Sequence, residues 1–188
     1  MEPAVGFVFV LIALVLIAVI ASGQRKKIAA ALNDVASAHG LVFREHHGLD
    51  RRITGLKEGH QVEIRIGAEK ANHVLEQTWR IALVERLPPG FAAGKRGFLS
   101  RASAGAVPAP SGDEAFDRQV FVEATHAFAI EQFLTPDRKA ALVALIKEGG
   151  FVHGDSVYFR KTGLETDSAR LRARFQTLWN AVQALEHS

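Results

Sequence analysis

The sequence contains no cysteine. Disulfides, thiolate zinc sites, iron–sulfur clusters and cysteine nucleophiles are therefore excluded from this chain. Its other proportions are close to globular averages, with 48% hydrophobic and 23% charged residues among 188. These proportions exclude a collagen, a coiled-coil rod and a fully disordered chain. The length predicts one ordinary domain with an appendage, and not two full domains.

Charge of either sign is not strongly in excess. Lysine and arginine number 23 against 20 aspartate and glutamate residues, which leaves a formal net charge of +3, and the pI is about 9.4. This mildly basic balance is compatible with an anionic partner, but it is too weak to identify one.

The first part of the chain has one long stretch without any charged or hydrogen-bonding side chain, from Ala4 to Ala21. Thirteen of these eighteen residues are Val, Ile, Leu or Phe, which on the insertion scale favours a bilayer by about 4 to 8 kcal/mol. A helix of this length rises roughly 27 Å, close to the thickness of a hydrocarbon core. The sequence therefore predicts a transmembrane helix within residues 1–24.

Basic side chains follow this apolar stretch, and none precedes it. Because Arg25, Lys26 and Lys27 come directly after the stretch, the positive-inside rule predicts an amino terminus outside the cell and a cytoplasmic domain. The expected location is the inner (plasma) membrane, with a single pass. Two alternatives stay open, namely a signal peptide cleaved near Ala21 and a buried helix of a soluble protein.

We predict that residues 25–188 form a single cytoplasmic domain of α+β class, with antiparallel strands packed against two or three helices. Polar and apolar residues alternate over 62–66 and 79–83, which is typical of half-buried strands. Further strands are expected at 41–45 and 116–123. The two residues Gly154 and Asp155 separate the strands of a tight hairpin.

Three helices are indicated by their periodicity and end signals. Apolar residues from Ile28 to Val35 recur at helical spacing, and Gly40 follows as a left-handed C-cap. Thr135 before Pro136 predicts a helix start with an N-cap threonine and proline at the first position. In the last part of the chain, Leu171, Phe175, Leu178, Val182 and Leu185 follow one another at steps of four and three, which predicts an amphipathic helix.

Residues 88–112 differ in amino-acid composition from the rest of the chain. Four of the six prolines and five of the sixteen glycines lie here. A loop of this length without secondary structure is uncommon inside a compact domain. We therefore predict a flexible Pro/Gly-rich loop that contains one short ordered piece near Phe98 and Leu99.

No motif in the sequence specifies a catalytic residue, a metal site or a cofactor. Residues 90–97 look like a phosphate-binding loop, but they lack one spacer residue and place Arg96 where Ser or Thr would hold magnesium. His153, Asp155 and Ser156 have the residue types of a hydrolase triad, yet they crowd on one turn. The histidines, including the His46-His47 pair, form no helical pair at metal-ligand spacing. We predict a protein that is not an enzyme.

Basic residues in two regions predict contact with anionic lipid headgroups. The predicted contacts are Arg25, Lys26 and Lys27 after the apolar stretch, and Lys95, Arg96 and Arg101 in the Pro/Gly-rich loop. Each basic side chain near an anionic leaflet adds about 1 kcal/mol of attraction. Binding of nucleic acid is not expected from the arginines that begin the last helix, because no reader motif or aromatic platform accompanies them.

Part of the second half resembles an uncharacterised bacterial membrane-protein family, a domain of unknown function. The resemblance is carried by Phe121-Val122-Glu123, by Phe133-Leu134-Thr135-Pro136 with the helix from Leu142 to Ile146, and by Val157-Tyr158-Phe159. It covers residues 113–160. The chain departs from the family in its single apolar segment at the amino terminus and in its shorter, proline-rich middle. The resemblance implies only a membrane-linked α+β domain, because no activity or catalytic residues are established for that family.

Together these features predict a single-pass membrane protein whose domain is a noncatalytic scaffold that binds protein or lipid. The expected partners are the membrane itself and either anionic headgroups or another membrane protein. Two other functions stay open, a membrane-associated enzyme of unrecognised type and a binder of anionic ligands or nucleic acid. An enzyme would need a closed pocket where titratable side chains converge.

Overall fold

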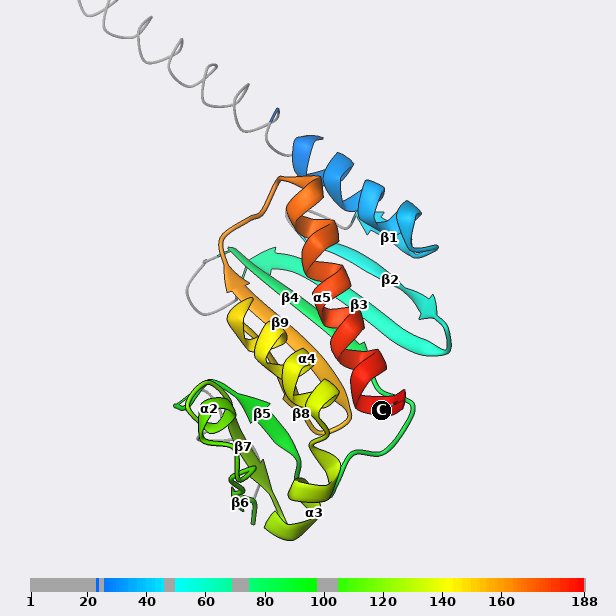
Figure 1. Ribbon diagram of the computed structural model, residues 1–188. Helices are drawn as coiled ribbons and strands as arrows, with labels where there is room; N and C mark the ends of the chain where they lie inside the picture. The colour runs from blue at the N-terminus through cyan, green and yellow to red at the C-terminus, as the bar shows by residue number, and fades with distance from the viewer. Residues whose placement is uncertain (1–22, 24–25, 46–49, 69–74, 98–104, 188) are drawn as a thin grey trace, which may run out of the picture.

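Figure 1 shows the computed structural model, in which helices cover one face of a single sheet. The structure describes residues 23, 26–45, 50–68, 75–97 and 105–187. Within these residues nine strands pair antiparallel in the order β1-β2-β3-β4-β9-β8-β5-β7-β6. The strand that comes last in the sequence thus lies in the middle of the sheet and joins the amino-terminal meander to the second half.

The strands of the first half are longer than most of those that follow. Their bounds in chain order are β1 Val42–Glu45, β2 Arg51–Lys57, β3 His60–Ala68, β4 Leu75–Ala82, β5 Ala92–Gly94, β6 Val107–Pro108, β7 Phe121–Ala124, β8 Gly150–His153 and β9 Ser156–Thr162. The helices labelled in Figure 1 are α2 Glu114–Asp117, α3 Ala127–Phe133, α4 Pro136–Lys147 and α5 Ser168–His187. A further helix spans residues 26–38.

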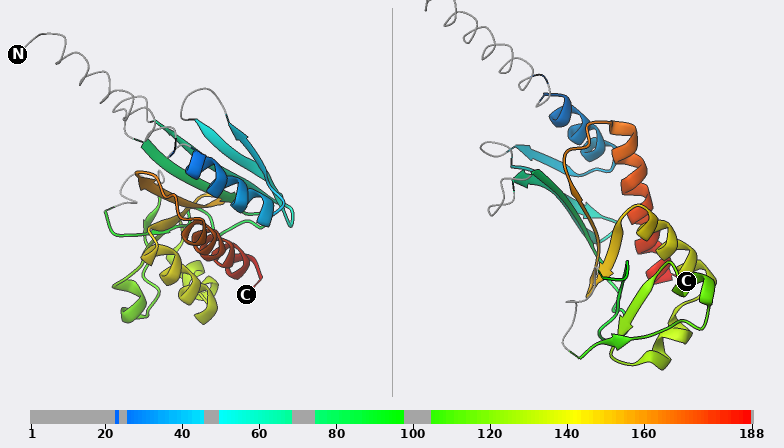
Figure 2. Two further views of the ribbon diagram at one scale, coloured as in Figure 1. Left: turned by 90° about the horizontal axis from the view of Figure 1, so that it is seen from above. Right: turned by 90° about the vertical axis from the view of Figure 1, so that its left-hand side faces the viewer.

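The alternation in the long strands sets which face of the sheet is covered. Val62, Ile64 and Ile66 of β3 are buried, whereas Gln61 before them and Arg65 between the two isoleucines are exposed. Helix 26–38, α4 and α5 all lie over the apolar face (Figures 1 and 2), and one cluster of buried side chains joins these helices to the sheet. The predicted strands over 62–66 and 79–83 and the hairpin at Gly154 are confirmed.

The predicted helix signals are also confirmed. Thr135 is the N-cap of α4, and its hydroxyl accepts a hydrogen bond from the amide of Arg138 at 3.3 Å. All five residues of the predicted stripe on α5 are buried. Gly40 follows helix 26–38 with a φ of +67°, the left-handed conformation of a C-cap.

The predicted strand over 116–123 begins later than expected. Residues Glu114–Asp117 form α2 instead, and β7 starts at Phe121. The reason is the side chain of Asp113, which accepts hydrogen bonds from the amides of Ala115 and Phe116 at 3.0 and 3.1 Å. This N-cap stabilises a helical turn before the chain can extend.

Residues 88–112, predicted as a flexible loop, contain two strands. β5 lies between β8 and β7 in the sheet, and its three residues are buried. β6 pairs with β7 at the edge of the sheet. The expected ordered piece at Phe98 and Leu99 falls outside the described residues. The sequence did not reveal β5 and β6 because strands of two or three residues rich in Ala, Gly and Pro carry no alternation.

Among the described residues, no helix combines the length and the apolar character needed to cross a membrane. The predicted transmembrane segment, residues 1–24, lies outside the described residues except for Gly23. The predictions of a fold with an N-terminal transmembrane helix, of a single-pass inner-membrane protein and of a cytoplasmic location are corrected by this finding. In the described helices, an apolar stripe packs on the sheet and the other face carries charged side chains, such as Arg172 of α5.

The end of helix 26–38 packs on α5 through His39, whose ring stacks on Phe175 with centroids 4.0 Å apart. Burial lowers the pKa of His39 below its ordinary value, and the charges of Lys57 and Arg172 lower it further. Because protonation is easier in the unfolded chain, His39 contributes stability that is complete above its unfolded pKa of about 6.5 and is lost as the pH falls toward the folded pKa.

Replacing His39 with phenylalanine should therefore flatten the loss of stability between about pH 7.5 and pH 5, because phenylalanine keeps the stack and takes up no proton. Urea unfolding at a series of pH values measures this slope. His187→Phe, at the exposed end of α5, is the matched control and should keep the wild-type slope. A His39→Phe variant with the wild-type slope would contradict the assignment.

Candidate functional site: an amphipathic groove at the sheet edge

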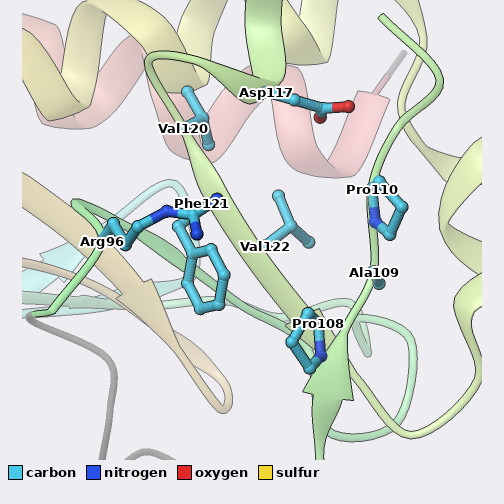
Figure 3. A pocket seen from close by; sticks show the side chains of 8 residues that line it. All are labelled: Arg96, Pro108, Ala109, Pro110, Asp117, Val120, Phe121 and Val122. Carbon is cyan, nitrogen blue, oxygen red and sulfur yellow. The ribbon is translucent and has the colours of Figure 1, made fainter. Parts of the chain in front are cut away.

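A groove of about 180 Å³ lies at the edge of the sheet where β6 and β7 end the strand order. Figure 3 shows its lining residues, with Val122 between the proline-rich segment and Arg96. The walls are mostly apolar. The lining residues are Arg96, Pro108, Ala109, Pro110, Asp117, Val120, Phe121 and Val122.

The prolines at this edge disfavour the pairing of a further strand. Pro108 lies in β6 opposite Glu123, and the amide of Ala109 donates to the carbonyl of Val122 at 2.9 Å. Pro108 and Pro110 have no amide hydrogen to offer a further strand, and proline within sheets is confined to edge strands and bulges. The edge therefore presents pyrrolidine rings and the side chains of β7, and not a full row of hydrogen-bonding groups.

Asp117, the one acidic side chain among the described lining residues, is already engaged by the backbone. Both carboxylate oxygens of Asp117 accept from the amide of Ser111, at 3.0 and 3.2 Å. Neighbouring Asp113 caps α2, and the amide of Phe116 holds the pKa of the Asp113 carboxyl below its usual value, with the charge of Lys139 acting in the same direction. These carboxylates fix the local fold of residues 111–117.

The basic side chain of the groove is available to a ligand. The guanidinium carbon of Arg96 lies 5.2 Å from the ring centroid of Phe121, which is the geometry of a cation–π contact. Arg96 is exposed, and it forms no ion pair with a carboxylate in the described ranges. The mouth of the groove thus offers an unpaired positive charge beside an aromatic ring and an apolar floor.

Four of the six residues predicted to contact anionic headgroups belong to the described part of the chain, and they lie in two separate regions of the fold. Lys95 and Arg96 are exposed in the turn after β5, whereas Lys26 and Lys27 are exposed at the start of helix 26–38, at the other end of the sheet (Figure 1). The predicted contacts Arg25 and Arg101 lie outside the described residues. Of the four described residues, Arg96 alone lines the groove.

Sequence reasoning missed the apolar walls of this site. Phe121 and Val122 were expected in a strand, and Pro108 and Pro110 in a loop, with nothing to indicate that they meet. The available signal was the pair Val120 and Val122, whose alternation around Phe121 marks a half-buried strand beside a proline-rich segment.

The other chemical motifs of the sequence have structural roles. Gly94 lies inside the buried strand β5, so residues 90–97 do not form a phosphate-binding loop. The hydroxyl of Ser156 donates to Asp155 at 2.8 Å and accepts from Arg80 at 3.0 Å, which places both residues in a hairpin network. The His46-His47 pair falls outside the described residues. Among the residues that the structure describes, no group of three or more His, Asp or Glu side chains is arranged to hold a metal ion.

Comparison with known proteins gives a fold relationship. No protein-family model matches the chain, and no curated protein matches its sequence. Among solved structures, the chain is similar to the crystal structure of the mycobacterial trehalose monomycolate transport factor A, with a TM-score of 0.57 and 9% sequence identity. The similarity covers 87% of this chain and 95% of that chain. At this identity, the likeness shows that the two proteins share a fold.

Proposed function

We propose that the domain is a noncatalytic lipid-binding module, and that the groove at β6 and β7 takes the hydrocarbon end of a lipid with an anionic headgroup. The observation that carries this proposal is the pairing of an apolar floor with the unpaired guanidinium of Arg96. Burial of hydrocarbon on Val120, Val122 and the prolines is favourable at about 25 cal/mol per Å². The charge beside Phe121 would hold a carboxylate or phosphate at the mouth.

The size of the groove limits what it holds. Its volume of about 180 Å³ is smaller than the roughly 300 to 1,000 Å³ of sites that enclose a drug-sized ligand. One end of a chain fits, and a whole lipid does not. The name of the structural neighbour supports a lipid as the ligand, since it describes a transport factor for trehalose monomycolate, and it has no bearing on the charge of the headgroup.

The residue types in the groove favour binding without catalysis. The described residues of its lining include no serine, histidine, lysine or tyrosine that could act as nucleophile or general base. The guanidinium of Arg96 does not lose its proton in proteins, and the Asp117 carboxylate accepts from the Ser111 amide. A ligand here would be held without being changed.

Binding of a fluorescent long-chain fatty acid, kept below its micelle concentration, tests this function. We expect Phe121→Ser to weaken binding about tenfold, because about 1.4 kcal/mol of apolar contact is lost. Arg96→Gln should weaken the fatty acid about fivefold and leave the fatty alcohol of equal length unchanged, because only the acid carries a charge. Titration by fluorescence measures each dissociation constant.

The chain offers a matched control for each variant. Phe128→Ser removes a phenylalanine of α3 that is 73% exposed and outside the groove. Arg86→Gln removes an exposed arginine from the segment after β4. Both controls should bind like the wild type. Equal binding by the Phe121→Ser and Phe128→Ser variants would contradict the proposed site.

A further inference from the structure

A second cavity, of about 310 Å³, lies between the first half of α5 and the end of β9. It is remote from the groove in the sequence and shares no lining residue with it. Its walls are polar and carry three basic and two acidic side chains. The lining residues are Glu148, Lys161, Glu165, Arg170, Ala173, Arg174 and Thr177.

The unusual feature of this cavity is the buried charge of Arg174. This side chain is only 8% exposed, and its guanidinium carbon lies 4.3 Å from the ring centroid of Phe159. Its Nε and Nη1 atoms are enclosed and have no hydrogen-bond partner among the described residues. No described carboxylate pairs with it within 4.0 Å, although buried charges are normally paired because desolvation of an ion is costly.

Two further cations stand at the rim with loose partners. Lys161 and Arg170 approach the Oε2 atom of Glu165 at 3.8 and 3.9 Å. Direct charge-assisted hydrogen bonds are about 2.7 to 2.9 Å long, so both ion pairs leave room for a closer acceptor. The other carboxylate oxygen, Oε1, accepts from the amides of Thr166 and Asp167 at 3.2 and 3.3 Å. Glu165 therefore divides its charge among four groups.

We infer that this cavity is a binding site for a phosphate group. A phosphate carries up to two negative charges and several acceptor oxygens, so it can meet Lys161, Arg170 and Arg174 at once. A carboxylate has one charge and two oxygens, so it offers less charge and fewer acceptor positions to these three cations than a phosphate does. The cavity is large enough for a tetrahedral oxyanion together with water. The phosphate is either inorganic or the terminal group of a larger molecule, since the same cations recognise both.

Thermal unfolding and calorimetric titration test this inference. Sodium phosphate should raise the melting temperature of the wild type above that in sodium chloride at equal ionic strength, because a ligand that binds only the folded state stabilises it. Arg174→Met should lose this rise and bind phosphate at least about tenfold more weakly. Methionine keeps apolar contact with Phe159 and removes the unpaired charge, so the variant should fold.

Arg172→Gln is the matched control. Arg172 lies on the same helix, is half-exposed and pairs with Asp34 at 3.6 Å outside the cavity. This variant should keep the wild-type response to phosphate. Should Arg174→Met fail to fold, Arg170→Gln and Lys161→Gln at the rim should each weaken phosphate binding, and a chemical-shift change of the Arg174 Nε–H on adding phosphate reports the same contact in the wild type.

Further ligands identify the source of the phosphate group. Glycerol phosphate binding more tightly than inorganic phosphate would assign the site to a phosphorylated molecule, and weaker binding would assign it to the free ion. Acetate binding as tightly as phosphate would overturn the preference for phosphate. Equal melting temperatures in phosphate and chloride, or an equal rise in the wild type and the Arg174→Met variant, would overturn the site itself.

Discussion

Replacing Glu186 with alanine is expected to lower the free energy of unfolding by about 3 kcal/mol, because the carboxylate contacts the buried ring of His60 and two backbone amides, and each buried group left without its partner costs about 1 to 3 kcal/mol. Glu186 lies near the end of α5 and is 1% exposed at its side chain. Its Oε2 atom is 3.2 Å from Nε2 of His60, which is 4% exposed. The His60 Nδ1 atom lies 3.0 Å from the carbonyl oxygen of Ala82, to which it donates.

The same carboxylate also binds the backbone of the segment that follows β4. Its Oε1 atom accepts from the amides of Val84 and Glu85 at 2.5 and 2.9 Å. Both bonds are partly buried, so their loss adds to the cost of leaving the His60 ring without its partner. The expected loss of about 3 kcal/mol is therefore shared between the buried imidazole of His60 and the two amides.

Urea unfolding measures this effect as a lower midpoint at an unchanged slope. Glu186→Gln should cost less than half as much, since an amide keeps an acceptor for the two backbone groups and can donate to a neutral His60. Glu131→Ala, on the exposed face of α3, is the control and should stay within about 0.5 kcal/mol of the wild type. A Glu186→Ala variant as stable as that control would contradict this role.

Replacing Gly90 with alanine is expected to destabilise the fold by about 3 kcal/mol or more, for two reasons that add. Gly90 has a φ of +71°, where an L side chain costs about 1 to 2 kcal/mol. Its Cβ would also lie 2.5 Å from Oγ1 of Thr125 and 2.9 Å from the Thr125 amide nitrogen. The hydroxyl can rotate away, but the amide donates to the carbonyl of Pro89 at 2.9 Å and is fixed.

The type of turn at Gly90 also favours glycine over any other residue. Pro89 and Gly90 occupy the central positions of a turn in which the amide of Phe91 donates to the carbonyl of Pro88 at 3.0 Å. Proline followed by glycine with positive φ is the pattern of a type II turn. Because the turn leads directly into β5, displacing it would separate β5 from its partner β7. Loss of fatty-acid binding should accompany the loss of stability, since β7 forms the groove.

Gly112→Ala separates the two contributions. Gly112 has a similar φ of +78°, and a Cβ there would meet nothing within 4 Å. It should therefore cost only the backbone strain of about 1 to 2 kcal/mol. Urea unfolding of both variants gives the difference due to the clash with Thr125. An equal loss of unfolding free energy in the two variants would show that the close approach of Thr125 does not contribute to the destabilisation.

The elements that the sequence predicts well carry their signals within a few residues. Thr135 and Pro136 start α4, and the spacing from Leu171 to Leu185 predicts the buried stripe of α5. Such caps and periodicities depend on hydrogen bonds and neighbours one helical turn away. For the same reason the hairpin around Gly154 is visible in the sequence, since its two strands are joined by two residues.

The short strands β5 and β6 depend on partners that are far away in the chain. Ala93 pairs with Val122 on one side and with Val152 on the other. Neither partner can be read from residues 88–112, where proline and glycine dominate the composition. The prediction of a loop there followed the local composition, whereas the hydrogen bonds offered by β7 and β8 decided the outcome.

The sequence by itself determined the absence of thiol chemistry, the long alternating strands, and the helices with their caps, because each of these follows from composition or from neighbours along the chain. Only the tertiary structure decided which side chains meet. The strand order brings Pro108 to Phe121 and so creates the apolar groove beside Arg96, whereas the packing of α5 on β9 brings Arg174 to Lys161 and creates the cavity with its buried cation. Local patterns in the sequence do not specify these contacts, since they depend on how strands pair and how helices pack on them.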